Sequence, residues 1–168
     1  GVYPIGSEKQ PYTGTFDGGG YTISGLYIND SSKNYVGLFG CVENGGTVKN
    51  VNVTDSYVSG NISVGGICGS NQNGNRAGLV LNCHNTGKVS GNENVSGVCG
   101  YNYSDSIIQG CYNTGTVSGT WYFGGVCGQN DGTLEKCYNT GKVGTGSTGF
   151  FVGGVCGYNG GRNGSPTI

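Results

Sequence analysis

The chain has 168 residues, of which 38 are glycine, 12 tyrosine and 8 cysteine; only 10% are charged, and the formal net charge is −1. Methionine is absent and other helix formers are scarce, which excludes an all-α protein, and the 3 prolines exclude a collagen triple helix. Because the net charge is near zero and no apolar run is long enough to span a bilayer, we expect neither nucleic-acid binding nor membrane insertion.

Repeats organise the chain into a single predicted domain. Residues 1–34 are expected to form a divergent N-terminal coil, residues 35–157 the repeats, and residues 158–168 the truncated start of a further repeat. One block recurs as Tyr35–Gly40, Val64–Gly69, Val95–Gly100, Phe123–Gly128 and Val152–Gly157. From Phe39 through Cys68, Cys99, Cys127 and Cys156 the steps are 29, 31, 28 and 29 residues. A second block lies between the copies, as Cys83–Val89, Cys111–Val117 and Cys137–Val143.

Both blocks read as short β-type runs separated by Gly, Asn and Ser turns. A unit of this length with so few large side chains cannot bury a core alone, so the units must stack on one another. We therefore predict an all-β fold, a right-handed parallel β-solenoid (β-helix) of about five coils with 28–31 residues each. A barrel or sandwich of hairpins is the alternative, but nothing in it requires this period.

Glycine and asparagine recur in fixed columns. Four glycines share a place in a strand-like run, where glycine is expected if another backbone approaches closely or the strand bulges: Gly66, Gly97, Gly125 and Gly154. Three more follow Asn-Thr and are predicted to be turn residues with positive φ: Gly87, Gly115 and Gly141. The two asparagine columns are expected to stack through amide hydrogen bonds: Asn71, Asn102, Asn130 and Asn159, and Asn85, Asn113 and Asn139.

The block Val-Gly-Gly-Val-Cys-Gly at residues 152–157, with Cys-Tyr-Asn-Thr-Gly-Lys-Val at residues 137–143, resembles the GLUG motif. That motif recurs in bacterial cell-surface proteins, including IgA-specific metallopeptidases and adhesin-like proteins. Residues 11–26 resemble the segment that commonly precedes it, and the cysteines resemble versions from Gram-positive anaerobes. The resemblance implies an extracellular, non-catalytic repeat region. The peptidase's zinc signature, His-Glu-x-x-His, is absent, so that activity is not carried over.

Candidate catalytic and metal-binding residues are few. His84, the single histidine, stands in the column of Tyr112 and Tyr138. We therefore interpret it as a substitution within the repeat rather than as a catalytic base or a zinc ligand. The 9 acidic residues do not recur in one column, as paired carboxylates or a calcium site would require. We expect no catalytic residue, no metal and no cofactor, and keep a polysaccharide-acting enzyme only as a third alternative.

Aromatic residues supply the candidate ligand contacts. Tyr112 and Tyr138 share a column, and Trp121 and Tyr122 begin the densest aromatic cluster. Exposed aromatic rows can stack on sugar rings, whereas tyrosines that pack between neighbouring coils are structural. We prefer the structural interpretation for the tyrosine column and regard the cluster at Trp121 as the best single contact site.

The eight cysteines allow two interpretations. Oxidising conditions outside the cell favour disulfides, and one register pairs Cys68 with Cys83, Cys99 with Cys111, and Cys127 with Cys137. In this register both cysteines of the preceding pair are replaced together, by Phe39 and Val51. The partner of Cys156 is expected at about position 171. The alternative is a ladder of reduced, buried thiols that act as small apolar side chains.

Taken together, the sequence predicts a non-catalytic repeat, spacer or adhesion region of a larger bacterial surface protein. A carbohydrate-binding module that uses exposed Tyr and Trp is the alternative. The expected partners are a host or cell-wall glycan or protein and the neighbouring domains of the same chain, and the expected location is outside the cell. Because a solenoid has open strand edges at its ends, we also expect either self-association or an end loop that covers an edge.

Overall fold

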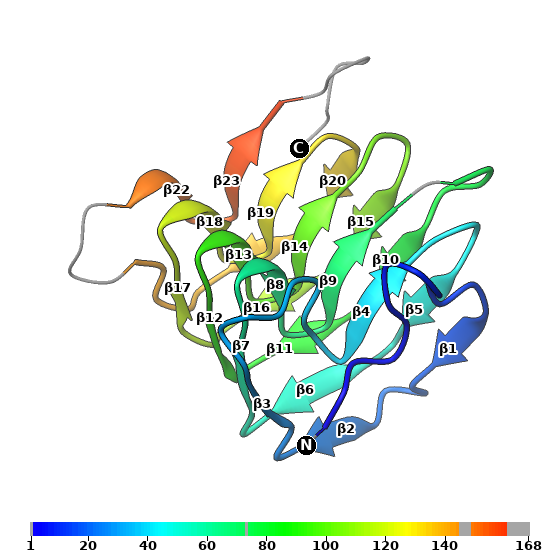
Figure 1. Ribbon diagram of the computed structural model, residues 1–168, viewed down its shortest axis with the longest axis horizontal. Helices are drawn as coiled ribbons and strands as arrows, with labels where there is room; N and C mark the ends of the chain where they lie inside the picture. Colours follow the sequence, from blue (N-terminus) through cyan, green and yellow to red (C-terminus); the bar gives the residue numbers. More distant parts are fainter. Residues whose placement is uncertain (1, 73, 145–148, 161–168) are drawn as a thin grey trace.

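The computed structural model describes residues 2–72, 74–144 and 149–160 (Figure 1). These ranges contain 23 short strands, which pair in parallel, and no helix. Nothing in the described part of the chain is therefore a helix that could cross a membrane. The absence of helix follows from the composition, since glycine, asparagine and β-branched residues dominate.

The chain passes in turn through five strand columns, named I to V here in the order of passage. Column I holds β1 (Thr15–Asp17), β5 (Thr47–Lys49), β10 (Leu79–Leu81), β15 (Ile107–Gln109) and β20 (Thr133–Glu135). Column II holds β2 (Thr22–Ser24), β6 (Asn52–Thr54), β11 (His84–Asn85), β16 (Tyr112–Asn113) and β21 (Tyr138–Asn139). Column III holds β3 (Tyr27–Asn29), β7 (Tyr57–Ser59), β12 (Lys88–Ser90) and β17 (Val117–Ser118). Column IV holds β8 (Ile62–Gly65), β13 (Glu93–Ser96), β18 (Trp121–Gly124) and β22 (Phe150–Gly153). Column V holds β4 (Phe39–Val42), β9 (Cys68–Asn71), β14 (Cys99–Asn102), β19 (Cys127–Asn130) and β23 (Cys156–Asn159).

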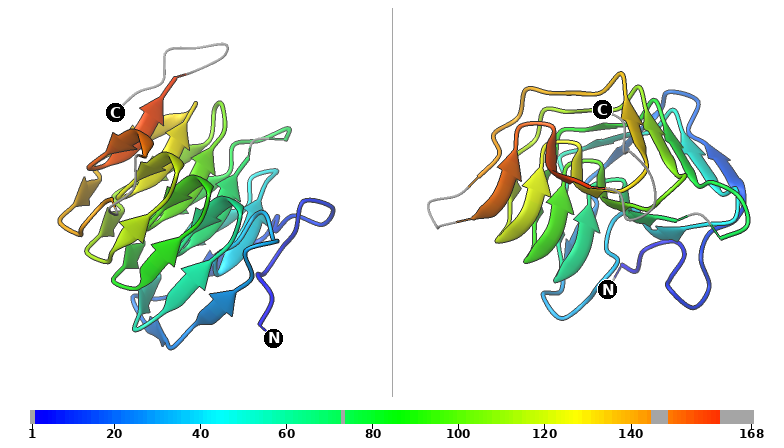
Figure 2. Two further views of the ribbon diagram at one scale, coloured as in Figure 1. Left: turned by 60° about the vertical axis from the view of Figure 1, so that its left-hand side comes forward. Right: turned by 90° about the horizontal axis from the view of Figure 1, so that it is seen from above.

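One passage through the columns makes one coil, and five coils stack in register along the axis (Figure 2). Single bridges complete two columns, between Val36 and Val64 in column IV and between Val117 and Val143 in column III. The predicted parallel β-solenoid of about five coils is thus confirmed. The first coil runs from β1 through β4, so it takes in the first, divergent copy of the repeated block as well as part of residues 1–34.

Two buried clusters run along the axis inside the coils. The main core joins the hydrophobes of column I to the cysteines, and contains Val48, Val80, Ile108 and Leu134. The side core joins columns III and IV, and contains Val58, Val89, Val117, Val64, Val95 and Phe123. Each coil therefore contributes only a few small side chains, and burial becomes substantial only because the coils repeat.

Both predicted asparagine ladders are confirmed. In the column V ladder, Nδ2 of Asn71, Asn102 and Asn130 donates to Oδ1 of the asparagine one coil later, at 2.9, 2.8 and 2.8 Å. In the column II ladder, Asn85 donates to Asn113 at 2.9 Å and Asn113 to Asn139 at 2.8 Å. The amides also donate to backbone oxygens of their own turns, as Asn113 does to Gly115 at 2.9 Å. The ladders thus tie each turn to the next coil.

The predicted structural glycines lie where neighbouring coils touch. A Cβ on Gly66, Gly97 or Gly125 would come within 3.0 Å of the carbonyl oxygen of the next glycine in the column. Gly154 differs, because nothing lies within 4 Å of the Cβ position in the last coil. Only glycine fits the first three positions, since a backbone carbonyl and the amide of a ladder asparagine both lie where a Cβ would be.

For a second set of glycines the predicted backbone conformation is wrong. Gly87, Gly115 and Gly141 do not belong to the glycines with positive φ. Glycine is required there because a Cβ would collide with the preceding coil: with the carbonyl oxygen of Ser56 at Gly87, of Gly87 at Gly115, and of Gly115 at Gly141. Close packing between coils, rather than the turn type, explains these residues.

The two ends of the solenoid differ. At the N-terminal end, Ile5 bridges to Phe39 and Tyr12 to Val42, so residues 5–12 run along the edge of β4, as an end loop that covers an edge would. The ring of Tyr12 packs on that of Phe39 at a centroid distance of 5.0 Å. At the C-terminal end, β20 to β23 have no strand beyond them among the described residues. Residues 161–168, most of the predicted start of a further repeat, lie outside the described residues.

Candidate functional site

The predicted ligand-contact residues fall on two separate surfaces. On column II, Tyr112 and Tyr138 pair directly, with ring centroids 4.8 Å apart and planes 7° apart. His84 continues the stack one coil earlier, 3.8 Å from Tyr112. In such a stack the ring faces between neighbouring coils cover one another, while Tyr138, the last ring, is 53% exposed. The geometry is that of a stabilising cross-strand ladder.

The second surface is the C-terminal aromatic cluster, which consists of Trp121, Tyr122, Phe150, Phe151 and Tyr158. Trp121 stacks on Phe150 at 4.3 Å and Tyr122 on Phe151 at 4.9 Å. Tyr158 on β23 meets Tyr122 and Phe151 with its edge, at 5.4 and 5.7 Å. Phe150 and Phe151 are about half exposed, at 49% and 51%. This is the largest group of exposed aromatic rings in contact with one another that the described residues contain.

A left-handed backbone residue shapes this cluster. Tyr122 has φ of 49° and Phe151 of 56°, and the same position of column IV is left-handed in Tyr35, Ser63 and Asn94. A regular strand alternates its side chains between two faces, but here Trp121 and Tyr122 are both accessible while Phe123 is buried. Phe150 and Phe151 were missed at the sequence level. The available signal was the adjacent aromatic pair of residues 121–122, which recurs 29 residues later.

The predicted disulfides are absent from the structure. All eight cysteines are free. They form two ladders of thiols, in which Cys68, Cys99, Cys127 and Cys156 pair along column V and Cys83, Cys111 and Cys137 stack just before column II. The bonds predicted for Cys68–Cys83, Cys99–Cys111 and Cys127–Cys137 would have to run between the ladders. The reduced ladder, the alternative considered at the sequence level, is the arrangement observed.

Strand spacing and hydrogen bonding disfavour a disulfide within either ladder. Stacked strands lie about 4.8 Å apart, whereas a disulfide holds its Cβ atoms about 3.8 Å apart, so a bond within a ladder would have to draw two coils together locally. Each thiol of the two ladders instead donates to a backbone oxygen, as Cys68 Sγ does to Ser70 at 3.0 Å and Cys127 Sγ to Gln129 at 3.1 Å. Cys41 lies outside both ladders, and burial raises the pKa of its thiol to about 11.

Burial and neighbouring thiols set the acidity within the ladders. Burial raises the pKa of the Cys68, Cys111 and Cys127 thiols well above the ordinary value. At the C-terminal end, hydrogen bonds from Cys111 and Cys127 lower the pKa of Cys137 and of Cys156, respectively. These two thiols are also only partly buried. Since thiolate content and access together control reactivity, we expect Cys137 and Cys156, at the C-terminal ends of the two ladders, to be the most reactive thiols.

The acidic side chains have structural contacts. Asp131 is buried and accepts a hydrogen bond from the Tyr101 hydroxyl at 2.6 Å. Asp17 lies 3.7 Å from the ammonium of Lys49 on the surface. Among the described residues no three His, Cys, Asp or Glu side chains are grouped as a metal site would require. His84 contacts Tyr112 and the Thr114 hydroxyl rather than an acid, and burial lowers its pKa.

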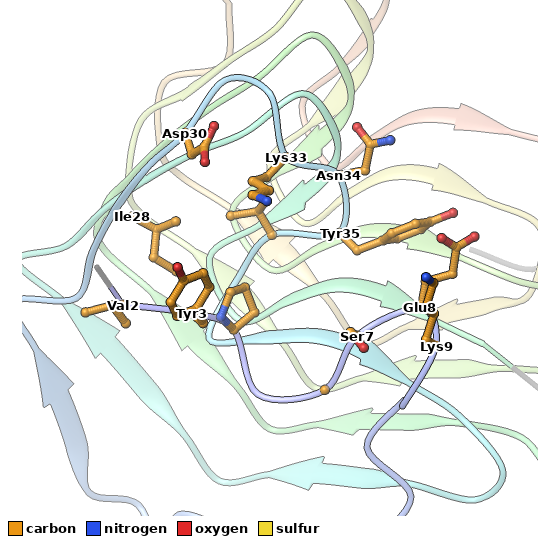
Figure 3. Close-up of a pocket in the computed structure, with 13 residues that line it drawn as sticks. Val2, Tyr3, Ser7, Glu8, Lys9, Ile28, Asp30, Lys33, Asn34 and Tyr35 are labelled. Carbon is orange, nitrogen blue, oxygen red and sulfur yellow. The ribbon is translucent and has the colours of Figure 1, made fainter.

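A pocket of about 420 Å³ lies between the N-terminal segment and the first coil (Figure 3). Val2, Tyr3 and Pro4 line one side, and Ile28 and Val36 line the other. Ile28 and Val36 are the first members of the side core. The pocket therefore continues the core beyond the first coil, which accounts for its apolar lining.

Comparison with known families decides the identity of the repeats. The family described as the GLUG motif matches residues 60–90 and 119–144. The first segment runs from just before β8 to the end of β12, and the second from before β18 to beyond β21. These two segments are GLUG repeats. Each match begins just before the column IV strand and continues through columns V, I, II and III, so the matched unit is one full coil.

The GLUG repeats of this chain are similar to parts of much longer proteins. A candidate Gly-rich membrane protein of Evansella cellulosilytica is 39% identical over 59 residues, which are 35% of this chain and 7% of that protein. Halomucin of Haloquadratum walsbyi is 36% identical over 92 residues, or 53% of this chain and 1% of halomucin. The chain thus spans a small fraction of the length of these relatives.

A solved structure shares the solenoid fold over most of this chain. The crystal structure of a candidate immunoglobulin A1 protease from Bacteroides ovatus superposes with a TM-score of 0.72 and 28% sequence identity. The match covers 91% of this chain and 49% of that protein. The part of the solved chain that matches this chain is therefore about half of its length.

Proposed function

We propose that this chain is a non-catalytic GLUG repeat region that acts as a stiff spacer within a larger surface protein. The observation that carries the proposal is the unbroken stack, in which both cores and both asparagine ladders run from coil to coil. Side chains on the outside change from coil to coil, as in the column Glu93, Trp121 and Phe150. Such a stack extends the chain by about 4.8 Å per coil without a flexible joint.

The relatives support a surface location and a supporting role. One is described as a Gly-rich membrane protein and another as halomucin, and this chain matches only 7% and 1% of their lengths. The candidate protease shares the solenoid over 49% of its chain, which leaves the other half to supply a different activity. We infer that the solenoid positions other domains outside the cell.

Fluorescence energy transfer between reporter domains fused to the two ends tests the spacer. A stiff stack gives one narrow distance distribution that is insensitive to salt. A broad distribution, like that of a flexible linker of equal residue number, would contradict the proposal. Turnover of any polysaccharide by the chain would contradict its non-catalytic character.

Adhesion through a host or cell-wall glycan is the second candidate, and the C-terminal aromatic cluster favours it. Its rings are exposed on a chain of almost no net charge, which suits a neutral sugar. We expect any glycan binding to be lost in Trp121→Ala and retained in the matched variant Tyr138→Ala, measured on a glycan array. Glycan binding that survives Trp121→Ala would exclude this surface as the binding site. If the unchanged chain binds no glycan on the array, only the spacer role remains.

A further inference from the structure

The asparagine ladders have a direction, and it distinguishes the two ends of the solenoid. Within both ladders, each amide contact between coils runs from Nδ2 of one coil to Oδ1 of the next. The column V ladder starts at Asn71, whose Oδ1 is buried without a partner because Val42 fills the preceding position. At the other end Asn159 accepts from Asn130, but no described residue accepts from its own Nδ2. Among the described residues, the side chain of Val42 closes the ladder at its start, and nothing accepts from its last amide.

The backbone at the C-terminal end also lacks a covering coil among the described residues. In the three preceding coils, Gly66, Gly97 and Gly125 are each covered by the carbonyl of the next glycine in the column. Gly154 has the same place in the last coil, with nothing within 4 Å. Val152 is 48% exposed, whereas Val95 and Phe123 in the same column are 0% and 1% exposed. The surface left open is therefore a coil–coil interface already formed four times within this molecule.

The chemistry of this surface specifies its occupant. It needs a parallel strand edge, a glycine carbonyl over Gly154, and an amide oxygen beyond Asn159 and beyond Asn139. The N-terminal face of a second copy does not supply these, because residues 5–12 occupy the edge of β4 and the ladder positions hold Val42 and Ile23. In the sequence, Ile168 follows Asn159 at the spacing at which Val80 follows Asn71.

We propose that the C-terminal face docks one further GLUG-type coil, joined in cis, that carries glycine and both ladder asparagines at the matching positions. The proposal goes beyond a spacer role, since it specifies which face of the solenoid accepts its neighbour and which residues recognise it. The covered N-terminal edge and the open C-terminal edge together make growth of the stack one-directional.

An added coil tests the proposal on the full chain. Residues 81–102 are appended after Ile168, so that Ile168 takes the place of Val80, and Gly154→Ala is introduced into both the original and the extended chain. We expect Gly154→Ala to leave the urea midpoint of the original chain unchanged and to lower that of the extended chain. Amide hydrogens of β22 and β23 are expected to exchange about tenfold or more slowly once the coil is added.

The matched control is the extended chain whose added copies of Asn85 and Asn102 are replaced by alanine. We expect it to lose most of the added protection of β22 and β23. Equal effects of Gly154→Ala in the two chains, or an added coil that exchanges freely while the rest stays folded, would overturn the proposal. So would sedimentation in which the original chain dimerises and thereby protects β22 and β23, because the occupant would then be a second copy.

Discussion

Single buried amides hold neighbouring turns in place. Asn113 accepts from Asn85 at 2.9 Å and from the Gly115 backbone at 3.2 Å, and donates to Asn139 at 2.8 Å. It is fully buried, so its partners cannot turn to water when it is removed. The ladder therefore stabilises the fold through residues that a hydropathy pattern alone would assign to loops.

Removal of this amide tests the ladder. We expect Asn113→Ala to lower the free energy of unfolding by about 3 kcal/mol, because buried donors and acceptors on both neighbouring coils lose their partner. The exposed Asn92→Ala is the control, and it should change stability by less than about 0.5 kcal/mol. Urea denaturation measures both, and equal small effects would show that the ladder contributes nothing.

His84 makes the stack sensitive to acid. Burial lowers its pKa below the ordinary value of 6.5, so between the two values the unfolded chain binds the proton more readily than the folded chain. Stability is therefore expected to fall as the pH drops through 6.5, and to level off below the folded-state pKa. His84→Tyr restores the residue type of the column and should remove this dependence between pH 7.5 and 5.5. Identical urea midpoints of the original chain at both pH values would contradict the argument.

At the scale of the elements, the strand columns explain which positions could be predicted. Columns of identical residues, such as Asn102 and Asn130, reveal the stacking because they recur at a nearly constant step. The conformation of Gly115 could not be inferred, since its constraint is a carbonyl from another coil. The left-handed Tyr122 was also hidden, because bulky residues rarely adopt positive φ and only packing between coils imposes it.

The thiol ladders give a prediction of their own. We expect all eight cysteines of the native protein, unfolded under non-reducing conditions, to react as thiols, and no disulfide to appear in a peptide map. In the folded protein Cys137 and Cys156 should be alkylated first, because they are partly accessible and their pKa values are lowered. Cys68 and Cys127 should react only on unfolding. A Cys68–Cys83 link in the map would restore the disulfide register and contradict the ladder.

At the scale of the whole molecule, five small coils make one cooperative body with unlike ends. No coil has enough apolar surface to fold alone, so stability grows with each interface between coils. The same property suits a spacer, since its length is set by the number of repeats. Fold and repeat type could be predicted from sequence, whereas the aromatic cluster at Phe150 and Phe151 emerged only once the register placed them beside Trp121 and Tyr122.

Nuclear Overhauser contacts in solution test most directly whether the coils stack in parallel register. We expect nuclear Overhauser contacts between column neighbours that are far apart in sequence, such as Val80 with Ile108 and Val95 with Phe123. We also expect slowly exchanging side-chain amide protons on Asn102 and Asn113. Close Hα–Hα contacts between successive strands, as antiparallel hairpins give, together with rapidly exchanging asparagine amides, would contradict the parallel register.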